Sequence, residues 1–256
     1  MTFDSTATGQ DSNPDSGDPK SSDAKLPDRY GAMCLTQDQS FMEIFQAGLQ
    51  STEMNNHPWL RPRFFHMVQM LKLTSGLNGA TVDAGCFRGL SSYLICKYLN
   101  LEKTAIGESS YLGREHFMID SYEGLSEPVS QDGQESKQRW GEKAFTDTSV
   151  ERVLQTMKDF PDIKIVQGWI PDVLTEVPEQ QYRFVHIDVD LYQPTLDCLR
   201  YFYPRLVHGG IIVIDDFGPW RNKKWPGCQQ AVRLFSKQSS IPFAALDTGN
   251  AVFFKR

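Results

Sequence analysis

From Ala80 onward the chain alternates short apolar runs with amphipathic segments, and this alternation limits the possible folds more than any other feature. The apolar runs predict strands at Ala80–Ala84, His116–Asp120, Ile163–Gly168, Phe184–Asp188 and Ile211–Asp215. Apolar residues at helical spacing predict helices between and after them, at Ser91–Leu99, Ser149–Phe160, Thr195–Tyr203 and Cys228–Ser236. Strands and helices in this order indicate an α/β fold with an open, mostly parallel sheet and helices on both faces.

The end of the chain departs from this alternation. Phe243–Leu246 and Ala251–Phe254 flank a short polar turn, which predicts an antiparallel hairpin instead of another crossover. A doubly wound, Rossmann-like sheet that ends in such a hairpin favours the class I methyltransferase variant over the plain dinucleotide-binding fold. Before the sheet, apolar residues within Gln37–Leu49 and Arg63–Leu73 recur at helical spacing and predict two N-terminal helices.

The first part of the chain has a different composition from the rest. Residues 1–29 are rich in Ser, Asp, Gly, Pro and Thr and contain hardly any apolar side chain, so we expect a disordered acidic tail. Met1 to Asp28 carry a charge of −4 out of the formal −6 of the whole chain. We expect residues 30–256 to form a single domain, with N-terminal helices in 30–77 and the sheet in 78–256.

Several classes of protein are disfavoured by the pattern of charges and cysteines. No basic stripe indicates nucleic-acid binding, and no run of about 18 apolar residues indicates a membrane span. The first thirty residues lack the apolar stretch of a secretory signal. Five scattered cysteines without a CxxC pair are typical of reduced thiols in a cytoplasmic protein, with neither disulfides nor structural zinc.

A glycine turn follows the first predicted strand. Gly85 and Gly89 allow the backbone to approach a small polar ligand at a helix N-terminus, although their spacing is not the dinucleotide fingerprint GxGxxG. Asp83 at the end of the strand could accept a hydrogen bond from an ammonium group. Asp120 ends the second strand, where an acid can bind a ribose diol. Trp169, after the third strand, could line an adenine pocket.

Four aspartates follow the fourth and fifth strands. Asp188, Asp190, Asp215 and Asp216 should meet at the carboxyl edge of the sheet, because strands four and five are expected to be neighbours. Carboxylates at that density raise one another's pKa values unless a cation neutralises them. Oxygen ligands suit a hard divalent ion, and Mg²⁺ is the first expectation. His186 lies within the strand and is expected to be a core residue with satisfied hydrogen bonds.

Taken together, these motifs resemble the macrocin O-methyltransferase family of sugar-modifying enzymes in antibiotic pathways. The resemblance covers most of Ala80 to Lys255, and it rests on residues 83–89 (DAGCFRG), 120–125 (DSYEGL), 168–172 (GWIPD), 186–192 (HIDVDLY) with 194–196 (PTL), 203–206 (YPRL) with 209–210, and 215–218 (DDFG). One departure is Asp83, which stands where many relatives have a glutamate.

The resemblance implies S-adenosylmethionine and Mg²⁺ as cofactors. It implies Asp188, Asp215 and Asp216 as metal ligands and Asp190 as the general base. The residues expected around S-adenosylmethionine are Asp83, Gly85, Cys86, Ser91, Asp120, Ser121, Gly168, Trp169 and Asp188. A sugar hydroxyl bound to Mg²⁺ would become more acidic, and Asp190 would remove its proton before methyl transfer.

The acceptor pocket is expected to involve the N-terminal helices, Pro219–Gly227 and Glu123–Asp147, a segment that resembles the mobile segment of the family. The family also implies a homodimer or a higher homo-oligomer.

Three other functions fit parts of the pattern. A metal-dependent hydrolase would leave the Gly85 turn and Asp120 without a purpose. A catechol methyltransferase is expected to have an Asp-Asn pair among its metal ligands, at the place where this chain has Asp215 and Asp216. A noncatalytic cofactor-binding module would not need all four acids.

Overall fold

The protein is described by a computed structural model that covers residues 38–218 and 225–256. The predicted acidic tail, residues 1–29, lies outside the described residues, as does most of the segment from Pro219 to Gly227. Among the described residues, no helix combines the length and the apolar character needed to cross a membrane.

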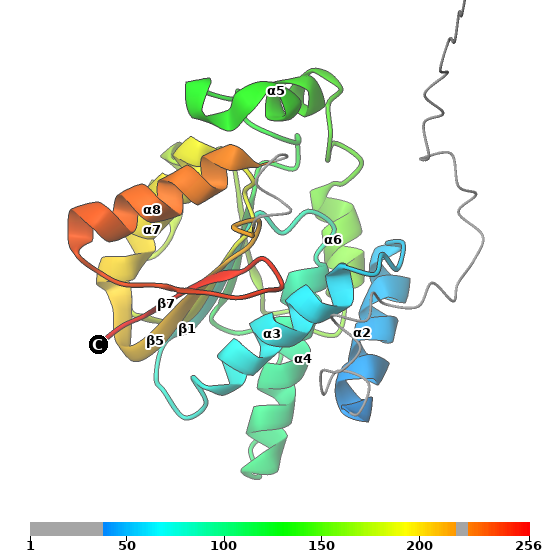
Figure 1. The fold of residues 1–256 in the computed structure, drawn as a ribbon. Coiled ribbons are helices and arrows are strands. Elements are labelled where there is room, and N and C mark those ends of the chain that lie inside the picture. The colour runs from blue at the N-terminus through cyan, green and yellow to red at the C-terminus, as the bar shows by residue number, and fades with distance from the viewer. Residues whose placement is uncertain (1–37, 219–224) are drawn as a thin grey trace, which may run out of the picture.

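Within the described residues, seven strands form one mixed sheet in the order β3-β2-β1-β4-β5-β7-β6 (Figure 1). The strands are β1 (Ala80–Ala84), β2 (His116–Asp120), β3 (Lys164–Gln167), β4 (Tyr182–Ile187), β5 (Leu206–Ile214), β6 (Ala244–Ala245) and β7 (Ala251–Phe254). The first five pair in parallel, whereas β7 pairs antiparallel with both β5 and β6. The predicted doubly wound sheet with a C-terminal hairpin is therefore confirmed.

Helices cover both faces of this sheet. They are α2 (Gln39–Thr52), α3 (Leu60–Lys72), α4 (Leu90–Ala105), α5 (Gly133–Gly141), α6 (Val150–Thr156), α7 (Tyr192–Arg205) and α8 (Pro226–Ser239), with short 3₁₀ helices η2 (Ser130–Asp132) and η3 (Asp172–Glu176). Successive side chains of a strand point to opposite faces. Ile212 and Ile214 of β5 accordingly belong to the core under α7 and α8, and Ile211 and Val213 belong to the core under α2, α3 and α4.

Strand β5 begins earlier than its apolar run predicts. Val207, His208 and the two following glycines look like a loop in the sequence, yet they extend the strand back to Leu206. The backbone N–H of Gly209 donates to the carbonyl of Lys255, and the N–H of Lys255 donates to the carbonyl of Gly210. Pairing with the C-terminal strand therefore overrides the local preference of these residues.

The segment Glu123–Asp147 contains helical structure that the sequence pattern did not predict. It forms η2 and α5, and Asp132 between them is buried. One carboxylate oxygen of Asp132 accepts a hydrogen bond of 2.7 Å from the backbone N–H of Tyr192, the first residue of α7. This bond fastens the segment to the start of α7, beside the edge of the sheet where the acids lie.

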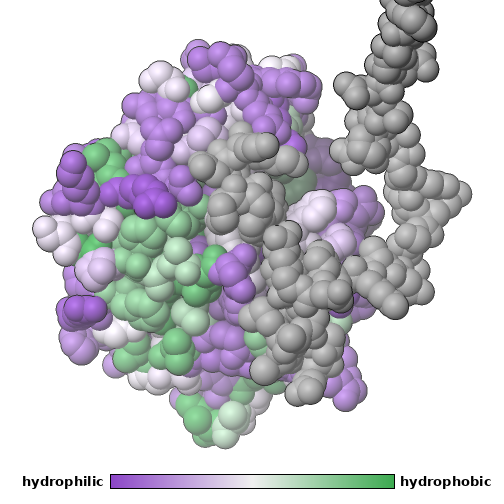
Figure 2. All heavy atoms as spheres, in the orientation of Figure 1, coloured by the Kyte–Doolittle hydropathy of each residue, from purple (hydrophilic) through white to green (hydrophobic). Residues whose placement is uncertain are grey.

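The molecular surface is uneven in polarity. Figure 2 shows hydrophilic residues over α5 and the outward face of α8, and an apolar area over the C-terminal hairpin below α8. The hairpin contributes Phe254, which is 40% exposed.

Candidate active site at the carboxyl edge of the sheet

The parallel strands bring the predicted site residues to one edge. Ala84 of β1 is paired with Ile187 of β4, which in turn is paired with Ile214 of β5. The residue after each strand continues the ladder, since the N–H of Asp188 donates to the carbonyl of Ala84 and the N–H of Asp215 donates to that of Ile187. The sheet register therefore places the Gly85 turn and the two aspartates side by side.

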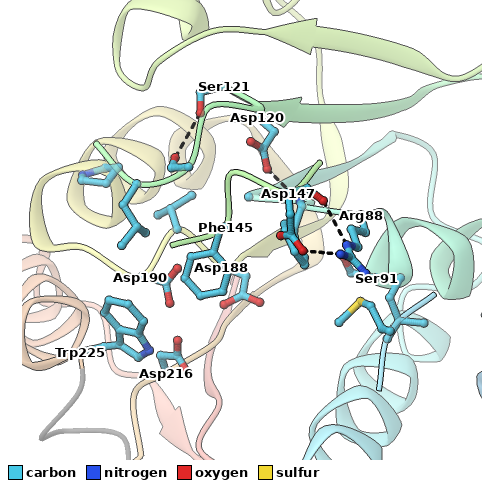
Figure 3. Close-up of a pocket in the computed structure, with 18 of the residues that line it drawn as sticks. Arg88, Ser91, Asp120, Ser121, Phe145, Asp147, Asp188, Asp190, Asp216 and Trp225 are labelled. Atoms are coloured by element: carbon cyan, nitrogen blue, oxygen red, sulfur yellow. Dashed lines mark hydrogen bonds and ion pairs between the residues drawn. The ribbon is translucent and has the colours of Figure 1, made fainter. Parts of the chain in front are cut away.

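A cavity of about 570 Å³ opens at this edge (Figure 3). The predicted site residues that line it are Gly85, Ser91, Asp120, Ser121, Gly168, Trp169, Asp188, Asp190 and Asp216. Three others, Asp83, Cys86 and Asp215, are buried and are not among its lining residues. The cavity thus unites most of the predicted cofactor residues with three of the four clustered aspartates.

Gly85 is required by the close approach of two strands. Its φ is 82°, in the left-handed region that favours glycine. A Cβ atom at this position would overlap the carbonyl oxygen of Asp188. The glycine turn therefore lets the end of β1 pass directly against the acid-bearing end of β4.

Asp120 is held rigidly at the end of β2. Its two carboxylate oxygens accept hydrogen bonds of 2.8 Å from the backbone N–H groups of Phe87 and Tyr122. Burial raises the pKa of Asp120, and the two backbone donors oppose that shift. Behind it, the thiol of Cys86 lies 3.4 Å from the hydroxyl of Tyr122 and is buried, so Cys86 supports the turn from the core side.

Asp83 lies behind the cavity wall, where its carboxylate binds three side chains. It accepts hydrogen bonds from the hydroxyls of Ser91 at 2.6 Å and Ser92 at 2.5 Å, and it lies 2.8 Å from Nδ1 of His186. Burial acts to raise the pKa of Asp83, but the hydrogen bonds, above all that with His186, lower it below its usual range. Asp83 is thus fully buried with these three partners, and its contact with an ammonium group stays a prediction.

Three aspartates face the cavity and one another, and we call Asp188, Asp190 and Asp216 the outer carboxylates. One ligand atom from each lies within 4.8 Å of the other two. Figure 3 shows these side chains around a common space. Burial and the nearby charge of Asp215 raise the pKa of Asp188 to about 8, and burial and the charge of Asp216 raise that of Asp190. Asp188 and Asp190 therefore hold a proton more tightly than exposed aspartates do.

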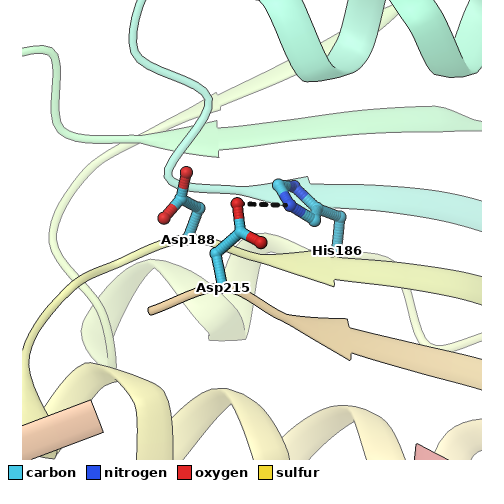
Figure 4. A group of neighbouring side chains, drawn as sticks. All are labelled: His186, Asp188 and Asp215. Atoms are coloured by element: carbon cyan, nitrogen blue, oxygen red, sulfur yellow. Dashed lines mark ion pairs between the residues drawn. The ribbon is translucent and has the colours of Figure 1, made fainter. Parts of the chain in front are cut away.

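Asp215 has different partners from the outer carboxylates. One of its oxygens binds a guanidinium nitrogen of Arg63 and lies 3.5 Å from Nε2 of His186 (Figure 4), and the other accepts from the amide of Asn250. Burial acts to raise the pKa of Asp215, but Arg63 and His186 lower it well below its usual range. Asp215, one of the three predicted metal ligands, is thus buried among hydrogen-bond donors and does not line the cavity, while one of its ligand atoms lies within 4.8 Å of ligand atoms of Asp188 and His186.

His186 is buried in the core, as the sequence predicts, but its hydrogen bonds are not all satisfied: Nδ1 lies 2.8 Å from Asp83, whereas Nε2 lies 3.5 Å from Asp215 and has no hydrogen-bond partner among the described residues. Burial alone would lower its pKa, but the carboxylates of Asp215 and Asp83 raise the pKa to about 10. The imidazole is thereby held between the ends of β1 and β5.

Arg63 is the most important site residue that the sequence motifs did not reveal. It lies in α3 and is 6% exposed, and its guanidinium contacts Asp215, lies 3.3 Å from Asp188 and lies 3.8 Å from Asp216. A signal was present, because Arg63 stands three residues after Leu60 and four before Met67, on the apolar stripe of an amphipathic helix. A charge on such a stripe predicts a buried partner of opposite charge.

Three aromatic side chains form part of the cavity wall, which we call the aromatic wall. Phe145 follows α5, Trp225 precedes α8 and Phe87 belongs to the glycine turn, and all three line the cavity. The ring of Phe145 lies 5.6 Å from that of Phe87 and 6.3 Å from that of Trp225. Because they come from three distant segments, no local pattern in the sequence predicts this wall.

Comparisons with known proteins agree with this architecture. Residues 62–256 match the family model described as Macrocin-O-methyltransferase (TylF), so the match begins within α3, upstream of the motifs that carry the resemblance. A tetracenomycin rhamnosyl 4′-O-methyltransferase of Streptomyces olivaceus is 28% identical over 192 residues, which are 72% of this chain and 68% of that protein. A mycinamicin III 3″-O-methyltransferase of Micromonospora griseorubida is 24% identical over 177 residues, 66% of this chain and 65% of that protein.

Solved structures show the same fold. The calicheamicin methyltransferase CalS11 superposes with a TM-score of 0.63 at 18% identity, covering 98% of this chain and 99% of its own. The O-methyltransferase NovP gives a TM-score of 0.61 at 20% identity over 75% of this chain and 79% of its own. Since the family model spans more than half of the chain, this protein belongs to the macrocin O-methyltransferase family and is an O-methyltransferase.

Proposed function

We propose that this protein transfers a methyl group from S-adenosylmethionine to one hydroxyl of a sugar diol on a glycosylated natural product, with the help of Mg²⁺. The observation that carries the proposal is the composition of the cavity at the sheet edge. One side is formed by the glycine turn, Asp120, Gly168 and Trp169, and the other side by the outer carboxylates. A cofactor and a metal-bound acceptor would therefore meet between them.

The donor set on the cofactor side fits S-adenosylmethionine. A carboxylate has about four lone-pair positions, so Asp120 can accept from two ribose hydroxyls in addition to its two backbone donors. Trp169 is 37% exposed and offers a ring face for adenine. Gly85, which lies against Asp188, and Ser91 also line the cavity, and we expect the methionine end near them.

The chemistry of the outer carboxylates fits Mg²⁺, which prefers oxygen ligands and binds through one or two carboxylates while keeping other positions for water or substrate. Asp188 and Asp216 would hold the ion, and Asp190 lies beside them. S-adenosylmethionine, when bound, supplies the methyl group, and Mg²⁺ supplies positive charge that acidifies a coordinated hydroxyl.

The residues of the chain would then position the acceptor and move one proton. Asp190 is the candidate general base, because burial and its acidic neighbours raise its affinity for a proton. The aromatic wall would exclude water and orient the sugar ring, so that the attacking oxygen is aligned with the methyl group.

The relatives support a sugar-bearing acceptor. Two of them are named for methylation of a rhamnosyl tetracenomycin and of a mycinamicin. Trp59 and His57 also line the cavity, with their ring centroids 4.5 Å apart, and their stacked rings could contact the part of the acceptor beyond the sugar.

The first test concerns the cofactor. Asp120→Ala leaves two ribose hydroxyls without an acceptor, and we expect the affinity for S-adenosylmethionine to fall by about tenfold, within the range of about 1–3 kcal/mol for an unpaired polar group. Isothermal titration calorimetry measures this affinity. The control is Asp159→Ala, which removes an exposed carboxylate paired with Lys97 and should leave the affinity unchanged. Unchanged affinity of Asp120→Ala for S-adenosylmethionine would show that Asp120 is not part of the cofactor site. Methyl transfer to a catechol but to no glycoside would show that the acceptor is a catechol and not a sugar.

A further inference from the structure

The C-terminal hairpin brings the turn between β6 and β7 to the acidic edge of the sheet. Strand β7 pairs antiparallel with β5, so that Ile214 lies opposite Ala251. One step further along the same register, Asp215 lies opposite Asn250. Residues that oppose each other in such a pair carry their side chains on the same face. The hairpin therefore presents the side chain of Asn250 to one of the clustered aspartates.

The turn is also fastened to the loop that carries Asp216. The backbone N–H groups of Phe217 and Gly218 both donate to the carbonyl of Gly249, at 2.8 and 3.0 Å. The loop after β5 is therefore held by the hairpin beyond the last pair of the strand ladder.

A chain of three side-chain hydrogen bonds runs through the turn to Asp215. Nδ1 of His66 in α3 lies 2.8 Å from Oγ1 of Thr248, and this hydroxyl donates to the amide oxygen of Asn250 at 2.9 Å. The amide nitrogen of Asn250 donates to one carboxylate oxygen of Asp215. Thr248 and Asn250 are buried, so these bonds are shielded from solvent. None of the four residues is among those that line the cavity.

The chain of hydrogen bonds has a fixed direction. A threonine hydroxyl has one hydrogen, and here it points to Asn250, so the hydroxyl oxygen can only accept from His66. An amide has one donor end and one acceptor end. Because the oxygen of Asn250 is turned to Thr248, its nitrogen faces Asp215. Without the hydroxyl the amide could turn round, and its oxygen would then repel the carboxylate.

The donor at one oxygen of Asp215 determines where the other oxygen points. Asn250 holds Oδ1, while Oδ2 contacts Arg63 and lies 3.5 Å from Nε2 of His186 (Figure 4). One ligand atom of Asp215 lies within 4.8 Å of ligand atoms of Asp188 and His186. The sequence predicts Asp215 as a metal ligand, and that role requires an oxygen on the side of Asp188.

We propose that Asn250 and Thr248 are positioning residues for methyl transfer. Asn250 orients the carboxylate of Asp215 toward Asp188, and Thr248 acts through Asn250 by fixing the direction of its amide. The inference rests on the proposed metal-dependent function and deepens it, because it adds two residues of the C-terminal hairpin to the site. The hairpin then serves the chemistry as well as the closure of the sheet.

The experiment compares two substitutions of Thr248 that differ in the hydroxyl. Thr248→Val removes the hydroxyl and nearly keeps the size of the side chain, whereas Thr248→Ser keeps the hydroxyl. Electron paramagnetic resonance measures the affinity of the full chain for Mn²⁺ without cofactor or turnover. Removing a group that hydrogen-bonds a metal-binding side chain typically costs about 10–100-fold in metal affinity. We expect a loss of about tenfold or more in Asn250→Ala, about three- to tenfold in Thr248→Val, and less than about twofold in Thr248→Ser.

Thr74→Val is the matched control. Thr74 is also buried, and its hydroxyl donates to the carbonyl of Leu71 at 2.7 Å, but it does not line the cavity and is not part of the chain of hydrogen bonds. This variant should have a lower melting temperature and an unchanged affinity for Mn²⁺. Circular dichroism shows whether each variant is folded, and the Thr248 pair decides the question if Asn250→Ala is not.

Equal Mn²⁺ affinities of Thr248→Val and Thr248→Ser would overturn the inference, as would wild-type affinity in a folded Asn250→Ala. A loss in Thr74→Val as large as that in Thr248→Val would also overturn it, because the effect would then follow from reduced stability. A wild-type protein that binds no Mn²⁺ would do the same. Failure of the proposed function is a separate result, since the wild-type protein would then bind no S-adenosylmethionine or transfer no methyl group.

Discussion

Aspartates that share one edge of the sheet acquire different properties from their immediate partners. Asp215 contacts Arg63, His186 and Asn250, and the first two lower its pKa, whereas burial and acidic neighbours raise the pKa of Asp188 and Asp190. An ionised carboxylate with a fixed cation serves as an anchor, and one with a raised proton affinity serves as a base. The role of each aspartate therefore depends on what surrounds it.

Asp190 provides the sharpest test at the scale of one residue. Asp190→Asn keeps the shape of the side chain and removes its basicity, so we expect turnover to fall by about 10²–10⁴-fold. Binding of Mn²⁺ and S-adenosylmethionine should survive, because Asp188, Asp216 and Asp120 remain. Steady-state kinetics with a glycoside acceptor and calorimetry measure the two effects separately.

The control for this variant is Asp197→Asn in α7, whose carboxylate accepts from the side-chain amide of Gln193 on the exposed surface of the helix. Treatment of the wild-type protein with EDTA should abolish transfer, and added Mg²⁺ should restore it. Normal turnover of Asp190→Asn at neutral pH would contradict the assignment of the base, and full activity after EDTA would contradict a role for the metal.

At the scale of elements, one ion pair ties the end of α4 to the beginning of β4. Both terminal nitrogens of the Arg183 guanidinium donate to Glu102, at 2.9 and 2.8 Å, and the backbone N–H of Gly76 donates to the same carboxylate at 3.0 Å. Burial acts to raise the pKa of Glu102, but these hydrogen bonds lower it. The pair thereby joins the segment after α3 to α4 and to the fourth strand of the sheet.

This pair makes stability depend on pH in a defined direction. Because the pKa of Glu102 is lower in the folded protein, its contribution is complete above the unfolded pKa of about 4.3 and is lost as the pH falls toward the folded value. Glu102→Gln should reduce the free energy of unfolding by about 1–2 kcal/mol at pH 7, with allowance for its partial exposure to solvent. The difference from wild type should shrink as the pH falls below about 4.

Urea unfolding at several pH values measures this difference. Glu108→Gln is the matched control, since Glu108 pairs with Lys103 at an exposed position and should change stability by less than about 0.5 kcal/mol. An equal effect of Glu102→Gln at neutral and acidic pH would show that the contact acts through packing and not through charge.

At the scale of the whole molecule, the cavity is assembled from segments spread along the described chain. Leu60 and Arg63 come from α3, Phe145 from the segment after α5, and Trp225 from the residue before α8. The sheet supplies only the edge on which they meet. The cavity therefore depends on the packing of α3 and of the segments around α5 and α8 against the sheet.

The acidic tail should not contribute to this assembly. Residues 1–29 contain too few apolar side chains to offset the entropy of ordering them. A protein that begins at residue 30 should keep its melting temperature within about 2 °C and its turnover within about twofold. Differential scanning calorimetry and kinetics test this, and a folded but inactive truncated protein would mean that the tail takes part in the site.

The sequence by itself determined the order of strands and helices, the C-terminal hairpin and the edge on which the acids gather. These features follow from periods of apolar residues and from acids and glycines placed directly after strands, which are local properties of the chain. For the same reason, the sequence alone brings together Gly85, Asp120, Trp169 and the outer carboxylates, which the structure places around one cavity.

Only the tertiary structure decided which groups these residues face. Asp83 and Asp215 follow the same local pattern as Asp120 and Asp188, yet they are buried against Ser92, His186 and Arg63. Arg63 precedes Asp215 by 152 residues, and the distance between two side chains that far apart depends on the packing of α3 on the sheet. Burial and charge pairing arise from that packing, and no short stretch of sequence encodes them.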